Sequence, residues 1–407
     1  MVRGRFTVGT TFLLGLAAVV TMALSSVELD NLRISSAQFS QDLFTVLREG
    51  KENENLVASP ISLQIALAML LAGAKENSKT QLSTVLHVGT EDLQTYLNAY
   101  KELLESIKDP VLNVASTVFV DSAIKLLDTY TTAVSTGIGA NVQQVDFATA
   151  PDAAAKTIND WCSTNTNGKI TDLFTADDLQ SASVVLANAV HFKALWKKKF
   201  DVQYTRERDF KSPTGVVKVQ MMFNSDHYNY AYSEQLKAEV LELPYASDKF
   251  RMLVILPNEG VALKDVDSSL KATGLDTIIK GMTSTKLDVY IPRFKVEMTI
   301  NLNDPLVKLG AADIFDQGKC NLTGISAAPL FVSQVKQKVF IEVNEEGTEA
   351  AAVTAARIQK RSLSFPEKFE ADHPFIFILI STKKPHGVAF FGAVLDPKTN
   401  SGTHDEL

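Results

Sequence analysis

The residues with the clearest chemical meaning lie near the C-terminus, where Arg357, Ile358, Gln359 and Lys360 precede Arg361 and Ser362. A serine protease with an acidic specificity pocket cuts after a basic side chain of this kind. The Arg361–Ser362 bond therefore suits the specificity pocket of a trypsin-like protease, and we call residues 357–362 the bait. The Lys360-Arg361 pair equally suits dibasic-cleaving proprotein convertases of the furin or kexin type, although Ile358 stands where their strongest sites carry arginine. Cleavage after Lys360 is the alternative.

The chain shows no catalytic machinery of its own. No Gly-x-Ser-x-Gly elbow occurs, and the six histidines lack the His-Glu-x-x-His spacing of a zinc site. We expect no cofactor, no metal and no enzymatic activity. The bait is therefore a substrate mimic rather than part of an active site.

An unusual segment leads to the bait, and its eight residues are Glu345, Glu346, Gly347, Thr348, Glu349, Ala350, Ala351 and Ala352. Alanine propensity favours a short surface helix from Glu349 to Arg357. Alternatively, the small side chains suit an extended segment that slides between two existing strands, with Gly347 as a flexible hinge. Extended, the 14 residues from Thr348 to Arg361 span about 45 Å.

The elements that must position this segment follow a simple order along the chain, with helices first and strands later. Helical spacing of apolar residues or helix-start signals predict helices over residues 36–47, 61–74, 91–108 and 153–163. Apolar β-type runs predict strands over residues 184–192, 238–245, 250–257, 288–294, 339–343, 375–380 and 388–394. This order predicts an α+β fold.

Several motifs in this order resemble the serpin family. The hinge segment Glu345–Ala352 resembles the hinge signature of inhibitory serpins, and the resemblance extends from about Ala37 to Pro397. Five further stretches carry it: Asn55–Ser62, Thr166–Ile170, Leu186–Lys193 with Trp196, Leu241–Tyr245 and Ala371–Phe375. The resemblance implies a single serpin domain over residues 26–397, with a helix-rich N-terminal half packed on large mixed and antiparallel sheets. It also implies an exposed reactive-centre loop at about residues 345–368.

The resemblance implies a suicide mechanism, in which the loop inserts as a new strand and traps the protease as a covalent acyl-enzyme. It places Ser59, Ser62, Asn188, Trp196 and Gln337 in the region where the sheet opens. Gln337 departs from the histidine that the family usually has there. Ordinary core packing or helix capping is the alternative for each of these residues. A non-inhibitory serpin, acting as chaperone or carrier, is the alternative function, and the unbroken Ala350–Ala352 run argues against it.

Both ends of the chain resemble targeting signals. Residues 1–25 combine Arg3 and Arg5 with a short apolar run, which predicts a signal peptide. Residues 398–407 form a polar tail that ends in the retrieval signal His404, Asp405, Glu406 and Leu407. We therefore expect an insect-type secretory-pathway serpin in the endoplasmic reticulum lumen, bound by a retrieval receptor and partly secreted, with no membrane span in its mature form.

Composition narrows the remaining possibilities. The net charge is -7, with 40 basic and 47 acidic side chains in mixture, so we expect no nucleic-acid partner. We expect a monomer. Cys162 and Cys320 are too few for a disulfide framework, and their pairing stays open. Asn321 begins a glycosylation sequon with Leu322 and Thr323.

Overall fold

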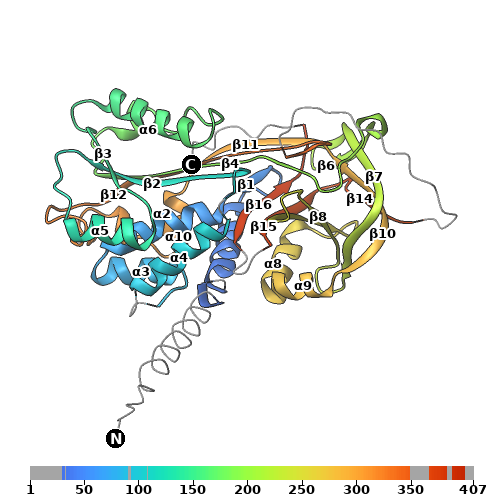
Figure 1. Cartoon of the computed structure of the whole chain (residues 1–407), viewed down its shortest axis with the longest axis horizontal. Coiled ribbons are helices and arrows are strands. Elements are labelled where there is room, and N and C mark those ends of the chain that lie inside the picture. The colour runs from blue at the N-terminus through green and yellow to red at the C-terminus, as the bar shows by residue number, and fades with distance from the viewer. Residues whose placement is uncertain are drawn as a thin grey trace, which may run out of the picture.

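The computed structural model describes residues 30–32, 34–89, 93–107, 109–348, 366–382 and 387–398. Its helices gather in the N-terminal half (Figure 1), as expected. A first helix covers residues 34–48. The further helices of this half are α2 (Pro60–Gly73), α3 (Glu76–Val85), α4 (Leu93–Ile107), α5 (Asp128–Gly137), α6 (Pro151–Asn165) and the short α7 (Ala176–Leu179). The four helices predicted from sequence are all present.

Helix α2 is the buried centre of the molecule. Pro60 occupies its first turn, where a missing N–H costs nothing. All its residues except Ala72 are buried, which is typical of a helix enclosed on every side. Ser59 precedes it without capping it, because its side chain makes no cap hydrogen bond. The capping alternative for Ser59 is therefore wrong.

The described strands form two sheets. The first has nine strands, in the order β1-β16-β15-β9-β8-β7-β10-β14 with β6 paired to β7. Their bounds are β1 (Leu56–Ala58), β6 (Arg206–Ser212), β7 (Gly215–Ser233), β8 (Ala238–Pro244), β9 (Phe250–Pro257), β10 (Thr283–Pro292), β14 (Glu367–Glu370), β15 (Phe375–Ser381) and β16 (Val388–Val394). The predicted pair of neighbouring strands, β8 and β9, is antiparallel and confirmed.

The second sheet has seven strands, in the order β3-β2-β4-β12-β13-β5 with β11 paired to β12. Their bounds are β2 (Leu112–Asp121), β3 (Gln143–Val145), β4 (Val184–Phe192), β5 (Ala194–Leu195), β11 (Phe294–Asn301), β12 (Val332–Val343) and β13 (Gly347–Thr348). Every residue of β4 is buried, as expected of a central strand covered on both faces.

The seven-stranded sheet lies between two helical layers (Figure 1). Helix α6 covers one face, and α2 with its neighbouring helices covers the other. Ile158 and Cys162 of α6 pack on Phe119 and Ala187 of the sheet in a separate core cluster. The remaining elements are α8 (Leu263–Thr273), α9 (Leu275–Gly281), α10 (Asn303–Leu309), and the 3-10 turns η1 (Val202–Tyr204) and η2 (Asp313–Phe315). This arrangement is α+β, as predicted.

The two cysteines do not form a disulfide with each other. Cys162 and Cys320 are both free thiols. Burial raises the pKa of Cys162 to about 12 and the pKa of Cys320 to about 11. Both side chains therefore stay as unreactive thiols at neutral pH.

Candidate functional site

The hinge begins inside the seven-stranded sheet. After β12 ends at Val343, a turn closes through a hydrogen bond from Asn344 N to Gly347 O (2.9 Å). Strand β13 then pairs antiparallel with β12 on one side, through Thr348 and Val343. It pairs with β5 on the other side, Gly347 opposite Leu195 and Thr348 opposite Ala194. Gly347 and Thr348 thus occupy a slot between β12 and β5, and we use this name below.

Gly347 fits the slot because it has no side chain. A Cβ at this position would lie 2.0 Å from Ala194 O and 2.6 Å from Leu195 Cα. Both contacts are with backbone, which cannot move aside as a flexible side chain would. Sequence reasoning assigned Gly347 to hinge flexibility, and the structure adds this close approach.

Thr348 is fully buried and held by an aromatic pair. Its Oγ1 lies 2.8 Å from the hydroxyl oxygen of Tyr245, whose pKa is raised by burial. The Tyr245 ring stacks on Trp196, with centroids 4.4 Å apart. Trp196 in turn donates from Nε1 to Asn344 O (2.8 Å) and from its backbone N to Glu346 O (2.9 Å). Trp196, expected near the sheet opening, thus contacts the hinge turn.

A buried ion pair anchors the turn before the slot. The Glu345 carboxylate, in a residue only 3% exposed, accepts hydrogen bonds from Arg293 Nε at 2.7 and 2.8 Å. Thr205 Oγ1 also donates to Glu345. The Lys199 ammonium pairs with Glu346 at the more exposed side of the turn. The turn is therefore fixed by charge as well as by backbone hydrogen bonds.

Below the slot, β4 and β12 are paired directly. Their parallel register runs from Val184 opposite Val332 to His191 opposite Phe340. We call this closed boundary the seam. His191 sits at its upper end, edge-on to Phe340 with ring centroids 5.8 Å apart. Burial, aided by nearby lysines, lowers the pKa of His191 to about 4, so the ring is neutral at physiological pH.

Four predicted sheet-opening residues meet on the α2 face of the seam. Gln337 and Asn188 are register neighbours across it. Gln337 Nε2 donates to Ser59 O (2.9 Å) and Ser62 Oγ (3.0 Å), and Gln337 Oε1 accepts from Ser59 N (2.8 Å). The glutamine thus joins the seam to α2 with both ends of its amide.

This network leaves two polar atoms unused. Ser59 Oγ and Asn188 Nδ2 are buried and have no hydrogen-bond partner among the described residues. Each such atom costs about 1 to 3 kcal/mol. The closed sheet therefore buries these two polar groups at a cost in stability.

The predicted bait lies outside the described residues. This holds for Arg357, Ile358, Gln359, Lys360, Arg361 and Ser362, for hinge residues 349–352, for the helix alternative at 349–357, and for the signal sequences at both termini. The chain is described again from residue 366, and β14 then pairs in parallel with β10. Residues 349–365 thus connect the slot in one sheet to an edge strand of the other.

Asn321 is half-buried in a polar turn. Its Nδ2 donates to Glu76 Oε2 (3.0 Å), and its Oδ1 accepts from Thr323 Oγ1 (2.7 Å). Within the described ranges, no cluster of three metal-ligating side chains occurs. In the same ranges no helix has the length and apolarity needed to cross a membrane.

Sequence reasoning missed several partners of the hinge, among them Arg293, Thr205 and Tyr245. It also missed Lys336 and Lys338, which are buried in β12. The predicted strand began only at Val339, whereas β12 starts at Val332, so the sequence analysis left both lysines outside it and gave no reason to expect them buried. Arg293 is a charged residue within the apolar run predicted as a strand over residues 288–294, and Tyr245 ends the Leu241–Tyr245 motif. Neither pattern, however, indicates a contact with the hinge.

Comparisons with known proteins agree on one family. A family model described as serpin (serine protease inhibitor) matches residues 35–397. Leukocyte elastase inhibitor of Equus caballus is 35% identical over 373 residues, which cover 86% of this chain and 96% of that protein. Serpin B4 of Homo sapiens is 35% identical over 393 residues, covering 91% and 100%.

A solved structure extends this agreement to the fold. Serpin48 of the insect Tenebrio molitor superposes with a TM-score of 0.80 at 29% identity, covering 90% of this chain and 98% of that one. The chain belongs to the serpin family and has the serpin fold. The family and the inhibitory relatives support serine protease inhibition as the activity of this chain, in the role of an inhibitor rather than an enzyme.

Proposed function

We propose that this chain inhibits a serine protease by a suicide mechanism, with Arg361–Ser362 as the reactive bond. The observation that carries the proposal is the occupied slot. Gly347 and Thr348 already form a strand between β12 and β5, directly above a seam that a longer strand would enter.

The chemistry belongs to the protease. Its serine oxygen forms an ester with the carbonyl carbon of Arg361, the bond to Ser362 nitrogen breaks, and the protease's histidine passes the serine proton to the leaving amine. Cleavage separates the segment that ends at Arg361 from the segment that begins at Ser362. Residues 349–361 then continue β13 along the seam as a new strand between β4 and β12.

The alternation of side chains supports this path. Thr348 presents a fully buried face in the slot, and Ala350, Ala352 and Thr354 share that face in an extended strand. None of them is large enough to block entry between packed layers. Insertion of residues 349–361 carries the bound protease along the seam, and the resulting distortion of its active site prevents water from hydrolysing the ester.

The target class follows from the bait. Arg361 suits a trypsin-like protease, and Lys360-Arg361 suits a dibasic-cleaving convertase of the furin or kexin type. We also propose that residues 1–25 direct the chain into the secretory pathway and that His404–Leu407 retain it in the endoplasmic reticulum. Convertases mature in that pathway, which is the reason to test them beside trypsin.

The test is to incubate the purified protein with trypsin and with a furin-type convertase, followed by denaturing gels and mass spectrometry. A complex that survives denaturation, with a released fragment that starts at Ser362, is expected. Thr348→Arg places a charge in the buried slot and should convert the protein into a cleaved substrate, whereas the matched Thr348→Ser keeps the complex. Cleavage of the unaltered protein without any stable complex would refute suicide inhibition and favour the non-inhibitory alternative.

A further inference from the structure

The connector between α6 and β4, residues 166–183, is tied to the neighbouring strand β12 by two buried lysines. Lys336 and Lys338 point to the α6 side of the sheet, opposite to Gln337 between them. They are only 4% and 5% exposed. The Lys336 ammonium lies 2.7 Å from Asp178 Oδ1, and the Lys338 ammonium 2.9 Å from Asp172 Oδ1.

The Asp178 carboxylate is oriented for this contact by its own helix. One oxygen, Oδ2, accepts from Thr175 N (2.7 Å) and Thr175 Oγ1 (2.8 Å) in the capping box of α7. The other oxygen is left for Lys336. Burial by itself would raise the pKa of Asp178, but the hydrogen bonds from Lys336 and Thr175 outweigh it and lower that pKa. The carboxylate is therefore charged in the folded protein.

The two ion pairs differ in strength. Side-chain exposure is 4% for Lys336 and 16% for Asp178, so water screens this pair little. Asp172 is 76% exposed, and Lys338 also has Glu297 as a partner at 3.2 Å. Lys336–Asp178 is therefore the pair whose loss matters more.

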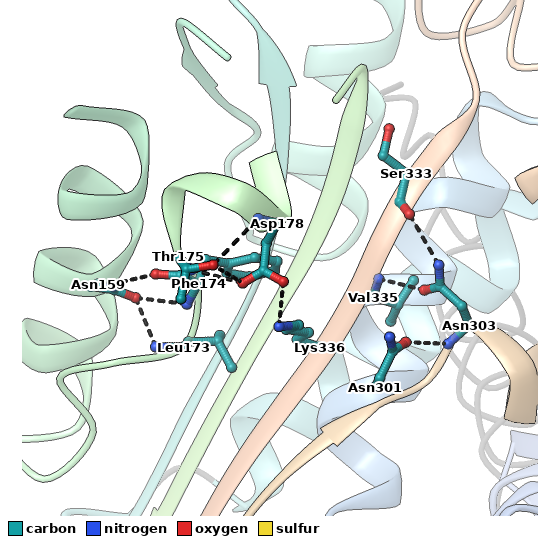
Figure 2. A network of polar contacts seen from close by, with 10 residues as sticks. All are labelled: Asn159, Leu173, Phe174, Thr175, Asp178, Asn301, Asn303, Ser333, Val335 and Lys336. Carbon is teal, nitrogen blue, oxygen red and sulfur yellow. Dashed lines mark hydrogen bonds and ion pairs between the residues drawn. The ribbon is translucent and has the colours of Figure 1, made fainter. Parts of the chain in front are cut away.

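Hydrogen bonds tie the backbone on each side of the pair to a neighbouring element (Figure 2). Asn159 of α6 accepts from Leu173 N (2.8 Å) and Phe174 N (3.0 Å) and donates to Phe174 O (2.8 Å). On the other side, Asn303 donates to Ser333 O (3.0 Å) and accepts from Val335 N (2.8 Å). The connector is thus attached to α6, and β12 is attached to Asn303, close to the two members of the pair.

The pair bridges the boundary that must open. Asp178 lies on the connector that runs directly into β4, and Lys336 lies on β12, opposite Ala187 of β4. Neighbouring strands are about 4.8 Å apart, and a strand placed between them doubles that separation. A 2.7 Å contact across the seam does not survive such a movement.

We propose that Lys336 and Asp178 form a latch across the seam that sets the rate at which a new strand enters it. Both are positioning residues, because neither contacts the protease. The inference rests on the proposed function, since it assumes that the seam opens to accept a strand. Its test measures opening without any protease.

The test adds a labelled synthetic peptide with the sequence of residues 348–361 to the intact protein and follows its uptake by fluorescence anisotropy and native gels. Lys336→Met keeps the aliphatic stem and removes the charge. It should take up the peptide about tenfold faster, equivalent to about 1.4 kcal/mol of barrier. Lys336→Arg keeps the positive charge, so its rate of peptide uptake should stay near that of the unaltered protein.

Two controls separate the latch from general destabilisation. Lys156→Met breaks the Lys156–Asp160 pair on α6, whose side chains are 75% and 65% exposed, and should leave uptake unchanged. Asp178→Asn should accelerate uptake as Lys336→Met does, and the double variant should be no faster than the faster single one, because both remove one interaction. If Lys336→Met folds poorly, Asp178→Asn carries the measurement.

Equal uptake by Lys336→Met, Asp178→Asn and the unaltered protein would overturn the latch, as would fully additive effects in the double variant. The absence of uptake by the unaltered protein and every variant would also overturn it. Accelerated uptake together with cleavage by trypsin and the convertase but no stable complex would keep the latch and refute the proposed inhibition.

Discussion

Removing the buried charge of Glu345 should loosen the hinge turn. In Glu345→Gln the side chain keeps its size and its contact with Thr205, but it loses the charge that pairs with Arg293. A hydrogen bond to a charged group contributes about 1.5 to 3 kcal/mol. The Arg293 side chain is 41% exposed and can be hydrated after the change, so we expect a loss near 2 kcal/mol rather than the larger cost of a fully buried pair.

The loss should be visible as a lower melting temperature and altered tryptophan fluorescence. At about 2.1 cal/mol/K of unfolding entropy per residue, a domain of this size loses about 3 °C in Tm for 2 kcal/mol. Trp196 reports locally, because it donates to Asn344 O in the same turn. A Trp161→Phe background removes the only other tryptophan.

Glu346→Gln is the matched control. The side chains of Glu346 and its partner Lys199 are 12% and 42% exposed, whereas Glu345 is 4% exposed and accepts hydrogen bonds from both Arg293 and Thr205. Loss of the Glu346 charge should therefore lower Tm by less than loss of the Glu345 charge. Equal Tm values for Glu345→Gln, Glu346→Gln and the unaltered protein would refute the reasoning that buried charge fixes the turn.

Three further predictions concern the slot, the seam and the buried carboxylate of Asp267. Gly347→Ala should lower stability by about 2 kcal/mol in denaturant unfolding, because the new Cβ meets backbone of β5; Gly281→Ala, where nothing lies within 4 Å, is the control. The pKa of His191 is lowered to about 4 in the folded protein, so the unfolded chain binds a proton at this residue more readily. The stability that His191 contributes is therefore fully present above pH 6.5 and is lost as the pH falls to 4. His191→Gln should therefore remove about 3 kcal/mol of this pH dependence in unfolding experiments. Burial raises the pKa of Asp267 to about 7, so ionisation of this carboxyl costs stability as the pH rises from about 4 to 7. Asp267→Asn should therefore be more stable than the unaltered protein at pH 8, by up to about 4 kcal/mol, and should not be more stable at pH 4.

Each of these has a contrary outcome. Equal stability of Gly347→Ala and Gly281→Ala would mean that β13 moves out of the slot without cost. An unchanged pH profile in His191→Gln would show that its ring is solvated at the top of the seam. A lower stability of Asp267→Asn at pH 8 would show that the charge of Asp267 is compensated by the neighbouring Arg48.

Part of the secondary structure could be predicted from the sequence because it depends on local patterns, although strands such as β2, β7 and β11 were not predicted. The helix that starts at Ser59-Pro60 and the apolar run of β4 each carry their periodicity within a few residues. Ser59 itself was less predictable. Its role depends on Gln337, 278 residues away, and it uses its backbone rather than its side chain.

The hinge could be located but not explained from the sequence. Small residues from Gly347 onward predicted a segment able to insert. That Gly347 is needed for the approach to Ala194, and that Glu345 is held by Arg293, depends on strands that meet only in the folded sheet.

The sequence by itself indicated the family and the order of many of the helices and strands, since these depend on patterns among residues that are close together along the chain. The tertiary structure alone decided that the hinge is already seated in the slot, that Ser59 Oγ and Asn188 Nδ2 have no hydrogen-bond partner among the described residues, and that Lys336 meets Asp178. The physical reason is that burial, hydrogen-bond satisfaction and ion pairing depend on distances between residues far apart in sequence. Those distances are set by how β4, β12 and the connector pack together.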